Sequence, residues 1–230
     1  EGYVAIEADR MRNLWLREED RQREMTVVRN EFEQSENDPQ QALDVEINAA
    51  AITAHPYHHS TIGWRSDIEN VPIEKLRAFY DTFYWPNNAT VSVIGDFEPA
   101  AVLNLVKRYY GPFPRSPQPI QTIYTAEPEQ QGERRVTLRR AGDLGIVGIA
   151  YKSVAGSDAD FPALNMLGTI LGSGKTSRFY KALTDKNLTL SATASAGFFH
   201  DPQLFQVYAF PAPGVEHSQV EKVVLEEIER

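Results

Sequence analysis

The chain has 230 residues, of which 42% are hydrophobic, and it carries a formal net charge of −9 at neutral pH. This is enough apolar material for one large or two small cores, whereas the excess of acidic residues argues against a nucleic-acid backbone as partner. Because there is no cysteine, disulfides and thiolate metal sites are excluded. No apolar run reaches the roughly 20 residues that span a bilayer.

The hydrophobic periodicity predicts a helical first half and a mixed second half. In the first half we expect one strand, at 89–95, and helices over 3–13, 18–36, 39–54, 73–84 and 98–110. In the second half we expect strands at 135–138 and 145–151, helices at 159–171 and 176–185, a hairpin of strands at 189–199 and 203–210, and a last helical pattern over 220–228. Helices that are segregated from hairpin-connected strands indicate an α+β fold, in which helices pack on a mainly antiparallel sheet.

A proline-bearing segment separates the two halves. Its five prolines are Pro112, Pro114, Pro117, Pro119 and Pro128. Proline removes backbone donors and favours extended conformations, so the segment is not expected inside a sheet or a helix. The sequence therefore predicts one domain at 1–112, a linker at 113–130 and a second domain at 131–230.

Two carboxylates on the helix predicted at 18–36 are candidates for a functional site. Glu24 and Glu31 are seven residues apart, so they project from one face of a helix, about two turns apart, with Val27 and Val28 between them. A solvated helix edge with salt-bridged acids has the same pattern. The pattern alone leaves both interpretations open.

The residues that follow this helix narrow the choice. They are His55-Pro56-Tyr57, Ile62-Gly63, Asp67-Ile68, Leu76, Phe79, Tyr80, Tyr84, Pro86-Asn87-Asn88-Ala89 and Val93-Ile94-Gly95-Asp96. Taken with Glu24 and Glu31, this order and spacing resembles the pitrilysin/insulinase family of zinc metallopeptidases, the inverted zincins, which includes the mitochondrial processing peptidases. The run from Ser157 to Leu183 is similar to the opening of the second domain of that family.

The resemblance implies a role for each carboxylate. In the family, a His-x-x-Glu-His motif on one helix is completed by a Glu further along the chain. Glu31 matches that third zinc ligand, and Glu24 matches a Glu that lies close to the metal and supports the site. No His-x-x-Glu-His occurs in this chain.

We therefore expect an excised middle portion of a longer zinc-dependent metalloendopeptidase, with both family domains truncated. The resemblance implies that residues 1–112 are the C-terminal part of the first, metal-site domain and that residues 131–230 are the N-terminal part of the second, non-catalytic domain. The fragment itself is expected to be inactive and to hold no Zn²⁺, whereas the full-length parent holds it. The alternative is a non-catalytic structural or substrate-binding subunit of the same family, which partners an active peptidase. Retention of both Glu24 and Glu31 favours the active parent.

The resemblance also implies partners: a peptide or unfolded polypeptide as substrate, and a homologous subunit or a second copy of the chain. The expected compartment is the bacterial periplasm or the cell exterior. No nucleic acid and no membrane span are expected.

Two other patterns offer competing sites. His55, His58 and His59 could in principle bind a metal, but Pro56 breaks the helical register between them, so His55 is expected to be a packed or hydrogen-bonded turn residue. The run from Gly172 to Ser177 is similar to the end of a phosphate-binding loop. That signature needs glycine where Thr169 stands, and the preceding residues have a helical pattern. We expect a glycine-rich helix C-terminus there.

Overall fold

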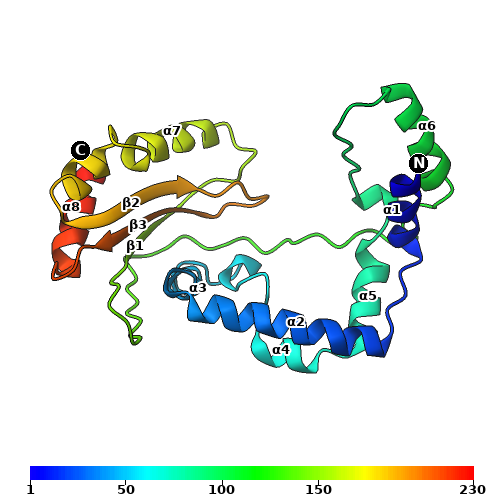
Figure 1. Ribbon diagram of the computed structural model, residues 1–230, viewed down its shortest axis with the longest axis horizontal. Helices are drawn as coiled ribbons and strands as arrows, with labels where there is room; N and C mark the ends of the chain where they lie inside the picture. Colours follow the sequence, from blue (N-terminus) through cyan, green and yellow to red (C-terminus); the bar gives the residue numbers. More distant parts are fainter. The chain divides into compact units, whose positions relative to one another are not determined.

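The computed structural model describes residues 1–230 and consists of helices and one small sheet (Figure 1). The helices are α1 (Gly2–Arg12), α2 (Glu18–Asn37), α3 (Pro39–Ala51), α4 (Arg65–Asn70), α5 (Ile73–Phe83), α6 (Pro99–Tyr110), α7 (Phe161–Gly172) and α8 (His217–Glu229). The strands are β1 (Val147–Lys152), β2 (Thr189–Ala196) and β3 (Leu204–Pro211). The predicted α+β class is confirmed. None of the helices combines the length and the apolar character needed to span a membrane.

The chain divides into two compact units. Unit 1 comprises residues 1–32 and 62–124, and unit 2 comprises residues 33–61 and 125–230. Unit 2 contains the whole sheet, which is antiparallel with the strand order β1-β3-β2. The central strand β3 pairs Val207 with Ile149 of β1 on one side and with Ala194 of β2 on the other.

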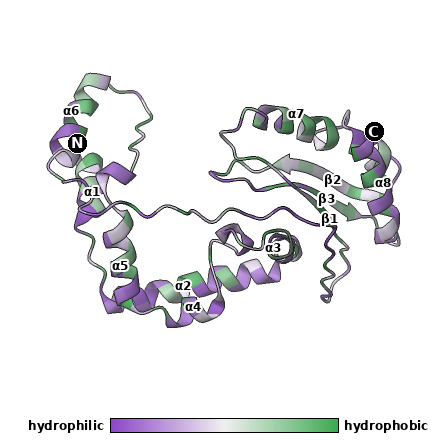
Figure 2. Cartoon of the chain, turned by 180° about the vertical axis from the view of Figure 1, so that it is seen from behind, coloured by the Kyte–Doolittle hydropathy of each residue, from purple (hydrophilic) through white to green (hydrophobic).

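The sheet of unit 2 is covered on both faces. Successive side chains of a strand point to opposite faces, and on β3 Phe205, Val207 and Ala209 belong to one apolar cluster with α7, α8 and the turn between α7 and β2. Leu204 and Tyr208 belong to a second cluster with α3. Figure 1 shows α7 and α3 on opposite sides of the sheet. Helix α7 is rich in apolar residues (Figure 2): Leu171 is buried in the first cluster, whereas Met166, Leu167 and Ile170 are exposed.

Helix α3 reaches the sheet from the first half of the sequence. It begins where Asp38 accepts a hydrogen bond from the Gln41 N–H at 2.8 Å, with Pro39 in the first turn, which is a favourable N-terminus. Its apolar side chains Leu43 and Ile47 pack in the second cluster. This packing is the reason that residues 33–61 belong to unit 2.

A carboxylate from the proline-bearing segment ties the end of α3 to the sheet. Glu127 accepts hydrogen bonds from the backbone N–H groups of Thr53 (2.9 Å), Ala54 (2.8 Å) and His55 (3.0 Å), and from Lys152 Nζ at 3.1 Å. Burial by itself would raise the pKa of Glu127, but these donors outweigh burial and hold the pKa well below its ordinary value. Within unit 2, one anionic group thus joins the end of α3 to β1.

Unit 1 has no comparable apolar core, because both buried clusters lie in unit 2. Polar contacts hold its helices together. Arg12 donates to the Tyr84 carbonyl at 2.7 Å and lies 3.7 Å from the centroid of the Trp85 ring, and the Tyr80 hydroxyl donates to the Arg10 carbonyl at 2.9 Å. Many large apolar side chains of this unit are exposed, among them Tyr3, Ile6, Trp15, Val27, Phe79, Ile94 and Leu103.

Most predicted helices are confirmed, with ends within a few residues. The helix expected at 176–185 is present, but as a π-helix over Tyr180–Thr184, and α4 was not predicted. The strands predicted at 89–95 and 135–138 are wrong. Both segments have no strand beside them to pair with, and Val91, Val93 and Val136 are exposed.

The predicted division at 113–130 stays a prediction. The segment forms no helix or strand, and residues 89–95 do not join the sheet that contains β1. The units nevertheless divide the chain differently, because residues 33–61 pack with the second half.

We predict that Glu127→Gln lowers the free energy of unfolding of unit 2 by about 2 kcal/mol at neutral pH. The amide keeps the shape of the side chain, but its NH₂ group faces N–H donors. Since the pKa of Glu127 is depressed in the folded state, its stabilisation is present above the ordinary pKa of 4.5 and is lost as the pH falls further. Denaturant unfolding from pH 7 to pH 3 should therefore show a shallower loss of stability in the variant. Parallel pH profiles in the two proteins would contradict this role.

Candidate functional site

Helix α2 carries the two carboxylates that the sequence indicates. Its first turn contains Glu18, Glu19 and Asp20, whose negative charges are favourable at a helix N-terminus. Glu24 and Glu31 follow on the same helix, both exposed to solvent, and neither makes a hydrogen bond or an ion pair. The structure leaves both groups free to bind a ligand. Their roles as zinc ligand and supporting residue stay predictions.

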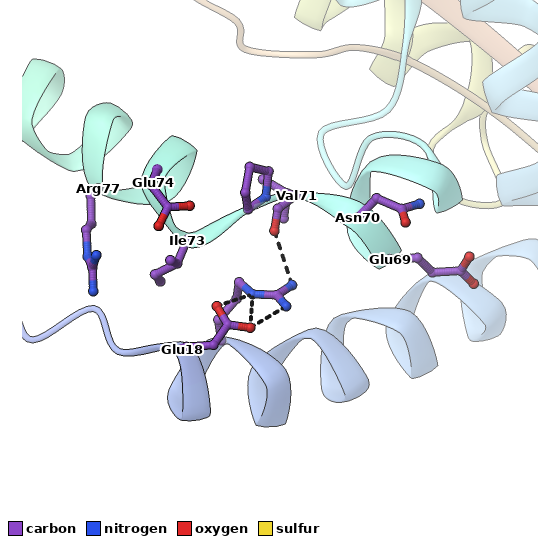
Figure 3. A pocket seen from close by; sticks show the side chains of 9 residues that line it. Glu18, Glu69, Asn70, Val71, Ile73, Glu74 and Arg77 are labelled. Atoms are coloured by element: carbon purple, nitrogen blue, oxygen red, sulfur yellow. Dashed lines mark hydrogen bonds and ion pairs between the residues drawn. The ribbon is translucent and has the colours of Figure 1, made fainter.

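A cavity of about 630 Å³ lies between the start of α2 and the connection from α4 to α5 (Figure 3). The guanidinium of Arg21 lies in its wall, where it donates hydrogen bonds to the Glu18 carboxylate at 2.6 Å and to the Val71 carbonyl at 3.1 Å. The hydrogen bond from Arg21 is the main cause that lowers the pKa of Glu18 to about 2. This cavity lies within unit 1 and is lined mainly by charged and polar side chains. Neither Glu24 nor Glu31 lines it.

The histidines near residue 55 do not form a metal site. His55 is buried; its Nδ1 accepts from the Tyr57 N–H at 3.2 Å, and its Nε2 lies 3.4 Å from Asp201 Oδ2. His59 Nδ1 donates to the next residue's carbonyl at 2.9 Å. No group of three His, Asp or Glu side chains in the chain could hold a metal ion. The expectation that His55 is a packed, hydrogen-bonded turn residue is confirmed.

The glycine-rich run after α7 is a helix C-terminus, as predicted. Helix α7 ends at Gly172, and Gly174 follows with a φ of +72°, which favours glycine. The Ser177 hydroxyl donates to the Gly174 carbonyl at 2.8 Å and accepts from the Tyr180 N–H at 3.3 Å. A phosphate-binding loop follows a strand, whereas this one follows a helix.

A groove of about 400 Å³ runs between α7 and β2. The residues that line it are small or carry neutral polar side chains: Asn165, Gly168, Thr169, Gly172, Ser173, Gly174, Thr193, Ala194 and Ser195. Helix α7 lies directly on the backbone of β2, since a Cβ added to Gly172 would come within 2.4 Å of Ala194 N. Strand β2, like β1, is an outer strand of the sheet, so one of its edges has no strand beside it. Such an edge can pair with an extended peptide.

Sequence patterns missed two groups of residues that organise unit 2. Glu127 contacts residues more than 70 positions away, and Asp44 accepts a hydrogen bond from the Tyr208 hydroxyl across 164 positions at 2.7 Å. Neither contact leaves a local signal, because periodicity and spacing report only on neighbours along the chain. The β2 groove likewise depends on strand order, which local patterns do not give.

The fit of this chain to zinc is incomplete. Glu31 has the carboxylate chemistry of a zinc ligand and an unpaired, exposed side chain. Catalytic zinc uses three protein ligands, and no set of three lies together in this chain. The residues of this chain alone therefore do not make up a catalytic zinc site.

Calorimetric titration should therefore show no stoichiometric zinc binding by this chain with a dissociation constant below about 1 µM. Glu31 and Glu24 alone supply too few ligands. A His58→Ala variant serves as the control for the histidine run. Sub-micromolar binding that this variant abolishes would restore the histidine alternative.

Comparison with known proteins gives consistent results. Residues 70–230 match the family model described as the peptidase M16 inactive domain. The zinc protease PqqE of Helicobacter pylori is 32% identical over 231 residues, covering 97% of this chain and 51% of that protein. An uncharacterized zinc protease of Mycobacterium leprae is 26% identical over 218 residues, covering 92% of this chain and 48% of its own length. This chain thus spans about half the length of these relatives.

Solved structures agree with the sequence relatives. The crystal structure of a protease from Helicobacter pylori superposes with a TM-score of 0.94 at 29% identity, over 99% of this chain and 56% of that one. The peptidase M16 inactive domain from Pseudomonas fluorescens superposes with a TM-score of 0.84 at 17% identity, over 99% of this chain and 55% of that chain, and shows the same fold. On the family match and these relatives, the chain belongs to the M16, or pitrilysin/insulinase, family of peptidases.

Proposed function

We propose that this chain is part of a longer zinc-dependent endopeptidase, called the parent protein below, in which α2 supplies one zinc ligand. The observation that carries the proposal is the exposed, unpaired carboxylate of Glu31 on a helix of a family whose relatives are named zinc proteases. Glu24, two turns earlier on the same helix, would orient the site through a water or a neighbouring ligand. The remaining ligands would lie in the part of the parent protein outside this chain.

Bound zinc would polarise the peptide carbonyl and lower the pKa of a water to near 7. This chain's own contribution is then to place an anionic oxygen at the metal and to hold the substrate. The groove between α7 and β2 supports the second task, because its walls carry no charge or bulky side chain and the edge of β2 offers unpaired backbone groups.

A second candidate function is a non-catalytic subunit that binds substrate for an active partner. The matched family model describes an inactive domain, which fits this candidate and also fits the non-catalytic second domain of an active peptidase. The two candidates differ in whether the parent protein carries a His-x-x-Glu-His motif and binds zinc.

In the parent protein, Glu31→Gln should lose most of the bound zinc and nearly all peptidase activity. Gln keeps the volume of Glu but lacks the anionic oxygen that a dication requires. Glu24→Gln should retain more zinc and fall in activity by about 10- to 100-fold, as expected for a group that acts through another. Metal content and turnover are measured on the same preparations.

Glu36→Gln is the matched control, since this exposed carboxylate lies on the same helix and its side chain makes no contact. It should leave both zinc content and activity unchanged. Equal zinc content in Glu31→Gln and the unmodified parent protein would show that Glu31 is not a ligand.

Peptide binding along β2 can be tested with N-methylated peptides. An added strand pairs through the N–H groups of every second residue. Two peptides are compared, one methylated at the odd-numbered backbone nitrogens and one at the even-numbered nitrogens, which are the two phases of methylation. Methylation in one phase should abolish binding and methylation in the other should leave it intact, as measured by fluorescence anisotropy. Equal loss in both phases, or no binding by the unmodified peptide, would rule out strand addition.

A further inference from the structure

The helix that carries Glu31 is attached to unit 2 at its C-terminal end. Helix α2 is continuous from Glu18 to Asn37, yet residues up to Phe32 belong to unit 1 and residues from Glu33 belong to unit 2. No residue of α2 is fully buried, and Met25, Val28 and Phe32 are only partly buried, so packing along its length is limited. The position of the part of α2 that carries Glu31 therefore depends on the contacts at the two ends of the helix.

The first attachment in unit 2 passes through α3. Only Asp38 separates the end of α2 from the start of α3. Asp44 on α3 accepts hydrogen bonds at a single carboxylate oxygen from the Tyr208 hydroxyl at 2.7 Å and from Gln206 Nε2 at 2.6 Å, both on β3. Burial, together with the bond to Asp44, raises the pKa of Tyr208, so its hydroxyl stays a donor at physiological pH.

The second attachment is direct. Arg140 donates to the carbonyl of Glu36 in the last turn of α2. The final carbonyls of a helix have no partner within the helix, and a cation there is favourable for the helix dipole. Glu31 lies five residues before Glu36, about 7.5 Å along the helix axis.

The opposite end of α2 is held in unit 1, where Arg21 donates to the Val71 carbonyl at 3.1 Å. That contact lies ten residues before Glu31, about 15 Å along the axis. The contact of Arg140 with Glu36 is therefore closer to the carboxylate than the contact of Arg21 is.

We propose that the sheet of unit 2 anchors the zinc-ligand helix, with Tyr208 and Arg140 as positioning residues for Glu31. This inference rests on the proposed function. Loss of the Arg140 contact frees the last turn of α2 directly, whereas loss of the Tyr208 hydroxyl loosens α3, which follows it; fraying from the C-terminal end of α2 then reaches Glu31 before the rest of the helix.

The first test is amide hydrogen exchange on this chain. Tyr208→Phe removes only the hydroxyl, and Arg140→Met removes only the guanidinium. Each should accelerate exchange of the amides of residues 29–37 by about fivefold, the factor that corresponds to one lost hydrogen bond. Amides of α8 should not change. Unchanged exchange in residues 29–37 would overturn the anchor.

The second test is zinc affinity of the parent protein, measured by competition with a chelator. Tyr208→Phe and Arg140→Met should each weaken zinc binding by about fivefold, and Arg140→Lys, which retains a cationic donor, should restore part of it. The controls are Arg139→Met and Tyr151→Phe, because both side chains are exposed and make no hydrogen bond.

The outcomes separate the two proposals. If the unmodified parent protein binds no zinc, the proposed function fails, and the positioning role fails with it. If it binds zinc, and the variants show faster exchange but unchanged zinc affinity, only the positioning role fails and the attachments are purely structural. Near-ultraviolet circular dichroism checks that the Tyr208→Phe variant folds. If that variant does not fold, the Arg140→Met variant still provides the test, because it alters only an exposed side chain.

Discussion

A three-stranded sheet whose central strand is apolar on both sides needs cover on both faces, and this requirement organises the molecule. On β3 the residues that point to one face pack against α7 and α8, and those that point to the other pack against α3. Without α3, Leu204 and Tyr208 would face water. Helix α3 therefore joins unit 2 despite its place in the first half of the sequence. Glu127 and Arg134 bind the backbone at and just after its C-terminal end.

Unit 1 differs from unit 2 in how much apolar surface it buries. Unit 1 has exposed apolar side chains on α1, α5 and α6 and no buried cluster, so arginine contacts to carbonyls and aromatic rings carry more of its stability. Such contacts contribute less per residue than a packed core. The segment 89–95 belongs to the same pattern, because its alternating valines have the composition of a strand and nothing to pair with.

Local sequence patterns predicted what depends on neighbours along the chain. The spacing of apolar residues and the residues at the helix ends predicted the helices α2, α5 and α6. Two strand-like segments separated by a turn predicted the β2–β3 hairpin. The same spacing put Glu24 and Glu31 on one face of a real helix. What failed depends on distant partners: the strands at 89–95 and 135–138, the packing of α3 on β3, and the contacts of Glu127. The residue types at those positions are ordinary, and only the tertiary structure makes them matter.

The long sequence distance between α3 and its binding surface also sets an order of events during synthesis. Asp44 leaves the ribosome about 160 residues before its partners Gln206 and Tyr208. At 5 to 20 residues per second this is a delay of roughly 8 to 30 s. During that time Leu43 and Ile47 lack β3, the strand that carries Leu204 and Tyr208 of their cluster. The contact of α3 with β3 is thus among the last to form, after the contact of Arg140 with the end of α2 has become available.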